Sequence, residues 1–183
     1  MEEYTATEEN KIIQTILNRK SVRQFLDKPI ENEKIEIIIR AGMSAPSARN
    51  RQPWKFFAVD DKKLLSELAD GLPYAKMLNE APLGIIVCGD IRDKEDSTAQ
   101  TFWVQDCAAA VENILIAVEA LGLGAVWTAC YPKKERVEVP QKVLDMPEGI
   151  IPLCVIPVGY PAIETPVKDK WNKDNFILNK WKN

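Results

Sequence analysis

Two separated blocks of the sequence carry side chains that could bind one ligand. The first, Arg19–Arg23 (RKSVR), places three cations and a hydroxyl at the end of a segment with helical periodicity. Its two arginines lie four residues apart, so on one helical turn their planar guanidinium groups could share a phosphate. The second, Ala45–Trp54 (APSARNRQPW), is a loop dense in uncharged hydrogen-bonding side chains that runs into a strand. Together the blocks indicate a ligand with an anionic end and a flat polar end.

Each block alone has a simpler explanation. The helix dipole favours cations at the C-terminal end of a helix, so Arg19–Arg23 could be a solvated basic helix end. Ala45–Trp54 could be a proline-bounded connection between a helix and a strand. The interpretation as a ligand site therefore depends on the two blocks acting together.

The order and spacing of the two blocks resemble the nitroreductase family of flavoenzymes. Three further segments match in the same order, namely Gly122–Ala129 (GLGAVWTA), Pro157–Pro161 (PVGYP) and the basic Lys168–Trp171 (KDKW). The resemblance implies an α+β fold, a nitroreductase-like three-layer sandwich with a central, mainly antiparallel sheet flanked by helices. It also implies an intertwined homodimer whose flavin mononucleotide (FMN) sites are built from both subunits.

The resemblance assigns the residues that bind FMN. The first basic block and two late lysines would hold the phosphate, the loop would approach the ring from the partner subunit, and the segment after Gly124 would lie along the ring. The assigned residues are Arg19, Lys20, Ser21, Arg23, Pro46, Ser47, Ala48, Asn50, Gln52, Trp127, Thr128, Ala129, Lys168 and Lys170. No side chain is assigned a catalytic role and no metal is expected, because N5 of the flavin carries the hydride.

Departures from the family pattern concern the electron acceptor. Some members carry an acidic residue followed by glycine where this chain has Trp127–Ala129, and a small flexible residue often replaces Ala48. Trp127 alone also has a simpler interpretation, as a strand tryptophan in the core. The differences leave flavin binding intact, but no particular acceptor follows from the sequence.

The implied activity is transfer of hydride from NADH or NADPH through FMN to nitro compounds, quinones or similar acceptors, in a ping-pong cycle. Two alternatives keep flavin binding. One is a reductive dehalogenase-like member of the same fold, although such variants usually need added segments for which 183 residues leave little room. The other is a flavin-binding sensor or storage protein without turnover.

The bulk composition limits the class of protein. With 46% hydrophobic residues among 183, we expect a single domain over residues 1–183, in which a C-terminal arm (residues 161–183) docks on the partner subunit. A net charge of -3 gives no general attraction for nucleic acid. Because no uncharged apolar run of about 18 residues is present and the N-terminus is acidic, we expect neither a membrane span nor a secretory signal. A cytoplasmic homodimer that acts on a small-molecule acceptor is the expectation.

The sequence lacks histidine, which excludes Ser-His-Asp and Cys-His nucleophilic machinery and histidine metal sites. Its four cysteines are Cys88, Cys107, Cys130 and Cys154. They are far apart and form no Cys-x-x-Cys pair, which argues against zinc and dithiol sites. We therefore expect a cofactor to supply the chemistry.

Hydrophobic periodicity predicts the elements that position these residues. The predicted helices are 8–18, 33–44, 62–72, 74–80, 97–121 and 133–145, with Thr7 and Asn32 as caps of the first two and Pro140 breaking the last. The predicted strands are 54–59, 83–89, 125–130 and 150–158, the last bulged at Pro152 or Pro157. The 97–121 helix is apolar around most of its circumference, so it should be buried on several sides, either within the domain or against a second subunit.

Overall fold

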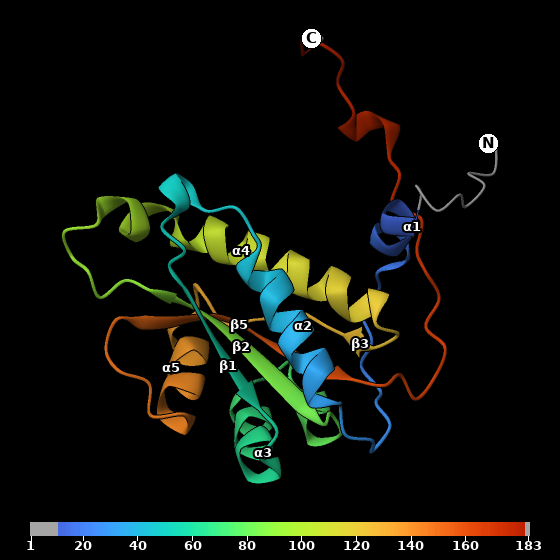
Figure 1. The fold of residues 1–183 in the computed structure, drawn as a ribbon, viewed down its shortest axis with the longest axis horizontal. Helices are drawn as coiled ribbons and strands as arrows, with labels where there is room; N and C mark the ends of the chain where they lie inside the picture. Colours follow the sequence, from blue (N-terminus) through green and yellow to red (C-terminus); the bar gives the residue numbers. More distant parts are fainter. Residues whose placement is uncertain (1–10, 182–183) are drawn as a thin grey trace.

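A five-stranded sheet separates two layers of helices in the computed structural model, which describes residues 11–181 (Figure 1). The strands are β1 (Trp54–Val59), β2 (Leu83–Asp90), β3 (Gly124–Ala125), β4 (Thr128–Ala129) and β5 (Ile150–Gly159). They pair antiparallel in the order β1-β2-β5-β3, and β4 also pairs with β5. This confirms the α+β sandwich with a mainly antiparallel sheet.

Helices cover both faces of the sheet (Figure 1). One face carries α2 (Asn32–Met43) and α4 (Ser97–Ala120), with α1 (Lys11–Asn18) beside α4. The other carries α3 (Lys62–Gly71) and α5 (Lys134–Val143). The remaining elements are the short 3-10 helices η2 (Ala48–Asn50), η3 (Lys76–Asn79) and η4 (Lys173–Asn175).

The central strand β2 is buried on both faces, as its continuous apolar sequence predicts. Ile85 and Val87 point into the cluster under α2 and α4. Ile86 and Cys88 point into the cluster under α3 and α5. The alternation holds the two helix layers on one rigid sheet, and this sheet carries the site described below.

A β-bulge in β5 confirms the expected irregularity near Pro152. Val87 opposes Cys154 and Cys88 opposes Pro152, so Leu153 is the extra residue of the bulge. The carbonyl of Leu153 accepts the backbone N–H groups of both Cys130 (2.9 Å) and Tyr131 (3.1 Å). The bulge therefore fixes the chain that leaves β4.

Several boundary predictions were wrong. The predicted strand 125–130 is split into β3 and β4, and the predicted helix 74–80 contains only the 3-10 helix η3. Pro140 does not break α5, which continues to Val143, because a proline removes one helical hydrogen bond while its buried ring still packs. Glu31 rather than Asn32 is the N-cap residue of α2, and it makes no capping hydrogen bond there. The predicted cap Thr7 lies outside the described residues.

Helix α4 is the central helix of the fold. By length and composition alone it could cross a membrane, but it packs against the sheet and α2, as core helices of soluble proteins do. Ten of its residues are buried among the described residues, including Ala110 and Ile114 in the core cluster. Packing within the domain thus accounts for most of its apolar circumference.

Candidate functional site

The basic block follows α1 as an extended segment. Ser21 forms a parallel bridge with Ala125, and the Val22 N–H donates to the Ala125 carbonyl at 2.9 Å. Val22 is buried directly over Gly124, where an added Cβ would lie 2.6 Å from the Val22 Cβ. The idea that Arg19 and Arg23 share one helical turn is therefore wrong, because α1 ends at Asn18 and the segment is tied to β3.

Two cations of the block already have acidic partners on α4. Arg19 Nε lies 3.1 Å from Glu112 Oε1, and Lys20 Nζ lies 2.8 Å from Glu119 Oε1. A phosphate at these side chains would compete with both carboxylates. Arg23 has no ion-pair partner among residues 11–181 and is exposed, so it is the available cation of the block.

A pocket of about 470 Å³ brings Arg23 together with the segment predicted to lie along the flavin ring. Trp127, Thr128 and Ala129 line it, together with Pro73, Tyr74, Lys76, Met77, Val126 and Arg136. Four residues predicted from two distant segments of the sequence thus share one cavity at the β3–β4 edge of the sheet.

The pocket wall is rigid and mostly apolar on its sheet side. Trp127 packs partly against the main core. The Thr128 hydroxyl donates to the Val155 carbonyl at 2.6 Å, so this donor is used inside the sheet. Ala129 is exposed and presents only a methyl group and backbone. A flat ring can lie against such a wall without displacing a side chain.

The charge of the pocket is its most distinctive property. Arg23, Lys76 and Arg136 line it, and no carboxylate does so among the described residues, although the whole chain carries a net charge of -3. Lys76 lies 3.8 Å from Asp70 in an exposed ion pair. Sequence reasoning missed Lys76, Arg136 and the neighbouring Tyr74, because only the fold brings η3 and α5 beside β4.

The polar loop lies elsewhere and is held by its own side chains. Arg49, Asn50 and Gln52 all have positive φ (50°, 55° and 52°), a conformation that is uncommon for residues other than glycine. The Gln52 N–H donates to Ser47 Oγ and its side-chain amide donates to Asn50 Oδ1, both at 2.9 Å. Three of the predicted loop residues therefore stabilise one another, while Pro46 stands exposed at the start of the loop.

Asp106 connects this loop to α4. Its Oδ1 accepts the Ala48 N–H at 2.9 Å. The carboxylate is buried, and its Oδ2 has no hydrogen-bond partner among the described residues. A buried, half-satisfied carboxylate is costly, so its presence here indicates that the position of the loop matters.

The loop and the basic block lie at opposite ends of α4 (Figure 1). The loop contacts α4 at Asp106, whereas Lys20 contacts it at Glu119. The axis between these two residues spans about 20 Å at 1.5 Å per residue. One chain therefore does not bring the two predicted halves of the site together.

Lys168 and Lys170 do not reach the pocket in this chain. Both lie exposed in the C-terminal arm, which runs past α1 and away from the sheet (Figure 1). The aromatic side chains of the arm are also exposed, including Trp171 (71%) and Trp181 (77%). The described part of the arm is thus a largely polar segment with exposed aromatic side chains that do not pack into the core of their own chain.

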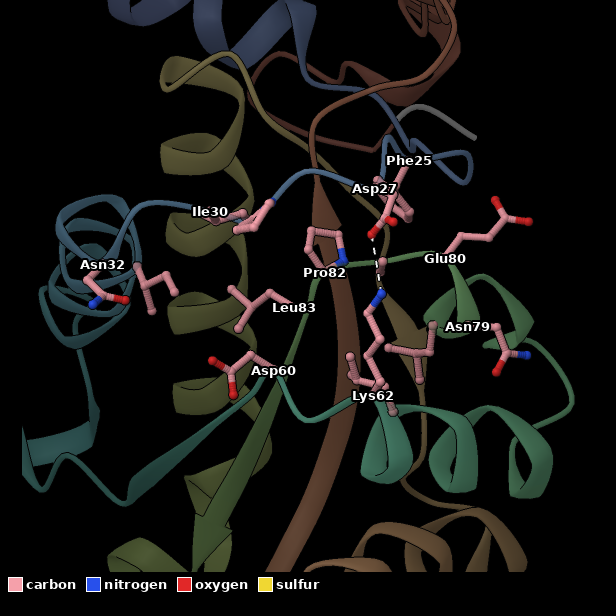
Figure 2. A pocket seen from close by; sticks show the side chains of 15 residues that line it. Phe25, Asp27, Ile30, Asn32, Asp60, Lys62, Asn79, Glu80, Pro82 and Leu83 are labelled. Atoms are coloured by element: carbon pink, nitrogen blue, oxygen red, sulfur yellow. Dashed lines mark hydrogen bonds and ion pairs between the residues drawn. The ribbon is translucent and has the colours of Figure 1, made fainter.

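A larger cavity of about 600 Å³ lies where β2 begins, at Leu83, and none of the predicted site residues lines it. Figure 2 shows Lys62 joined to Asp27, with Asp60 also lining the cavity. The Lys62 Nζ and Asp27 Oδ1 atoms are 3.4 Å apart. Glu80 also lines the cavity, so three carboxylates face one lysine there. This negative charge makes the cavity unsuited to a phosphate ligand.

Comparison with known proteins identifies the family. The family model described as "Nitroreductase family" matches residues 16–72 and 66–160. The chain belongs to the nitroreductase family. Both the cationic pocket and the polar loop lie within the matched residues, whereas the C-terminal arm lies beyond them.

Solved structures and curated relatives of this nitroreductase family member agree with the assignment. The crystal structure of a Parabacteroides distasonis protein provisionally named NADH dehydrogenase/NAD(P)H nitroreductase has a TM-score of 0.89 and 49% identity, covering 94% of this chain and 99% of that one. A Methanothermobacter thermautotrophicus protein with the same provisional name is 40% identical over 170 residues, 93% of this chain and 87% of the relative. A Desulfovibrio desulfuricans protein provisionally named a nitroreductase, crystallised in complex with FMN, has a TM-score of 0.79 and 27% identity, covering 94% and 99%.

The cysteines of this nitroreductase family member are structural. All four are free and buried, and burial raises the pKa of the Cys107 and Cys130 thiols to about 12. Burial also raises the pKa of Cys88 and Cys154 far above its usual range. Thiolates are therefore scarce at neutral pH, and no group of metal-ligating side chains occurs among residues 11–181.

Proposed function

We propose that this chain is an FMN-dependent oxidoreductase that takes hydride from NADH or NADPH and passes it to a small-molecule acceptor such as a nitro compound or a quinone. The observation that carries the proposal is the pocket in which three cations surround the exposed edge of Trp127–Ala129 without a carboxylate. Membership of the nitroreductase family and the FMN complex of the Desulfovibrio relative support it.

The residues of the pocket fit a flavin. Arg23 would donate to the phosphate and Lys76 to the electron-rich edge of the ring, and charge-assisted hydrogen bonds of this kind contribute about 1.5–3 kcal/mol each. Trp127 and Ala129 provide the wall against which the ring lies. Bound FMN supplies the hydride chemistry, which agrees with a site that has no histidine and no reactive thiol.

We further propose that two copies of the chain complete the site. The separation of the loop from the pocket supports this arrangement, because a partner subunit can bring its own Pro46–Gln52 loop to the ring. Exposed apolar residues support it as well: α1 exposes Ile12 and Leu17, and the arm exposes Phe176 and Leu178. Patches of this kind mark subunit interfaces, so we expect the arm to dock on the partner and to bring Lys168 and Lys170 toward the phosphate.

The reductant and the acceptor would use the pocket in turn. Trp127–Ala129 would hold the flavin ring against the wall of the pocket, which would leave the outer side of the ring for one exchangeable molecule at a time. The protein orients that molecule and excludes water, and no side chain is required as an acid or base. This arrangement favours ping-pong kinetics with parallel lines in double-reciprocal plots.

The test is the absorption spectrum of the purified, flavin-loaded protein without oxygen. NADPH or NADH should bleach the oxidised flavin bands, and a quinone or nitroaromatic should restore them. Flavin that stays oxidised with both nucleotides would favour the alternative of a sensor or storage protein without turnover.

A further inference from the structure

Arg136 is the pocket cation that the proposed FMN site leaves without a role. It lies near the N-terminus of α5, and its guanidinium carbon is 5.0 Å from the centre of the Tyr74 ring. Both residues line the pocket beside Ala129. The Tyr74 side chain is 67% exposed, so the pair forms the solvent-facing part of the wall.

The path of the chain orders the cations along the pocket. Ser21 forms a parallel bridge with Ala125, and the chain then passes from β3 through β4 before α5 begins. Arg19 and Lys20 face α4 on one side of the sheet, whereas Tyr74 and Arg136 come from elements on the other side. If Arg23, the available cation of the block, held the phosphate, the ring would lie along Trp127–Ala129, and Arg136 would lie beyond it beside Ala129.

The charge of Arg136 serves no other visible purpose. No carboxylate pairs with it in the described part of the chain, and stacking on Tyr74 leaves its N–H groups available to a ligand. Cations are disfavoured in the first turn of a helix, where the dipole is positive. The neighbouring Lys134 reduces this cost through an ion pair with Glu138 (3.6 Å), but Arg136 does not.

We propose that Arg136, oriented by Tyr74, binds an anionic phosphate or carboxylate group on the exchangeable substrate and so determines specificity. The inference rests on the proposed function, because it requires a flavin on the inner wall and a second molecule outside it. The anionic group has two possible sources. It is the 2′-phosphate that distinguishes NADPH from NADH, or it is an anionic substituent on the electron acceptor.

Direct binding tests the inference without turnover. Calorimetric titration of the FMN-loaded protein would compare NADP⁺ with NAD⁺, and 4-nitrobenzoate with 4-nitrobenzamide, which differ mainly in charge. Arg136→Ala should weaken binding of NADP⁺, of 4-nitrobenzoate, or of both at least tenfold, and should change each uncharged counterpart less than twofold. The affected pair identifies the source of the anion. Lys133→Ala is the matched control, because Lys133 precedes the same helix but does not line the pocket.

Two further variants separate specificity from structural damage. Arg136→Lys should recover part of the lost affinity, and Tyr74→Phe should retain it, because the ring that orients the guanidinium remains, whereas Tyr74→Ala should not. In steady state, Arg136→Ala should raise KM for the charged substrate and leave kcat within about twofold.

Two results would overturn the inference. Equal affinity changes for charged and uncharged ligands would remove Arg136 from recognition, and so would an FMN affinity that falls in Arg136→Ala as much as in Arg23→Ala. Failure of the proposed function has a different signature, because the wild-type flavin would then remain oxidised with either nucleotide.

Discussion

The two regions that contact opposite halves of helix α4 differ in charge and in hydrogen bonding. Beside its C-terminal half, the segment that contains Lys20 continues along β3 to Arg23, which lines a cavity that is rich in positive charge. At Asp106, the loop Ser47–Gln52 has uncommon backbone angles, and its polar side chains form hydrogen bonds within the loop. The first region presents cations that can bind an anion, and the second is preorganised in shape by its own hydrogen bonds. The proposed composite site, in which the loop of a second chain would reach the pocket, would combine the two properties.

Removing charge from the pocket end should have the largest effect. Arg23→Ala should lower FMN affinity at least tenfold, which corresponds to about 1.4 kcal/mol and is below the usual worth of a charged hydrogen bond. Arg19→Ala combined with Arg23→Ala should lower it about a hundredfold or more if the two contributions add. Fluorescence titration of FMN measures both, with Arg40→Ala as the control, because Arg40 pairs with Glu36 on α2 and does not line the pocket. An unchanged affinity in Arg23→Ala would remove the block from the site.

Removing the end of the arm tests whether the two ends of α4 meet across a dimer. Deletion of residues 171–183 removes the exposed Trp171, Phe176 and Trp181. The dimer should then dissociate at a higher protein concentration than the intact dimer does, and FMN affinity should fall as the dimer is lost. Sedimentation velocity over a range of concentrations checks the first effect. If the intact, flavin-loaded chain sediments as a stable monomer, the composite site is wrong.

Changing Asp106 tests the loop end. Asp106→Ala leaves the Ala48 N–H without its acceptor, at a cost of about 1–3 kcal/mol, and should lower FMN affinity several-fold through loss of loop position. Asp106→Asn can still accept this hydrogen bond, so FMN affinity should be largely recovered. Thermal unfolding and FMN titration on both variants separate stability from positioning. Wild-type FMN affinity in Asp106→Ala would show that the loop does not depend on α4.

The sequence predicted the layers and the backbone of the site better than its details. An apolar run such as Leu83–Gly89 predicts a buried strand whatever lies beside it. Pro152 predicts a bulge because it lacks the N–H that a regular strand pairing needs. The prediction that Arg19 and Arg23 lie on one helical turn was wrong. The hydrogen bond between Val22 and β3 holds this segment extended, although the periodicity of the sequence suggests a helix.

The missed pocket residues have a common cause. Lys76, Tyr74 and Arg136 come from separate elements, and no local pattern in the sequence links η3 to α5. The same holds for Asp106, whose role follows only from its contact with a loop far away in the sequence. Tertiary contacts of this kind can be found from a fold but not from spacing.

The contact between the N-terminus of α2 and Tyr160, the residue after β5, should depend on pH. The Tyr160 hydroxyl, followed by the backbone N–H of Glu31 and by Lys34, lowers the pKa of Glu31 from 4.5 to about 2. A lowered folded-state pKa stabilises the fold fully above the unfolded value of 4.5, and the contribution is lost as the pH falls toward 2. Glu31→Gln should therefore flatten the fall in the urea midpoint between these pH values. Glu33→Gln, on the same helix, should not, and equal slopes in both variants would contradict the assignment to Glu31.

The smallest effect is expected at Cys130, directly beside the pocket at the end of β4. Burial raises the pKa of its thiol to about 12, and its backbone N–H donates to the Leu153 carbonyl. Only the backbone of Cys130 therefore helps to position β4 beside the pocket. Cys130→Ser keeps that N–H and should retain turnover within about twofold, while burial of a poorly paired hydroxyl lowers stability by about 1–3 kcal/mol. Cys88→Ser, in the same cluster but farther from the pocket, should lose similar stability and no activity. Steady-state rates and flavin content decide the matter: if Cys130→Ser abolishes turnover while FMN stays bound and Cys88→Ser does not, a protein thiol takes part in the reaction and the cofactor does not act alone.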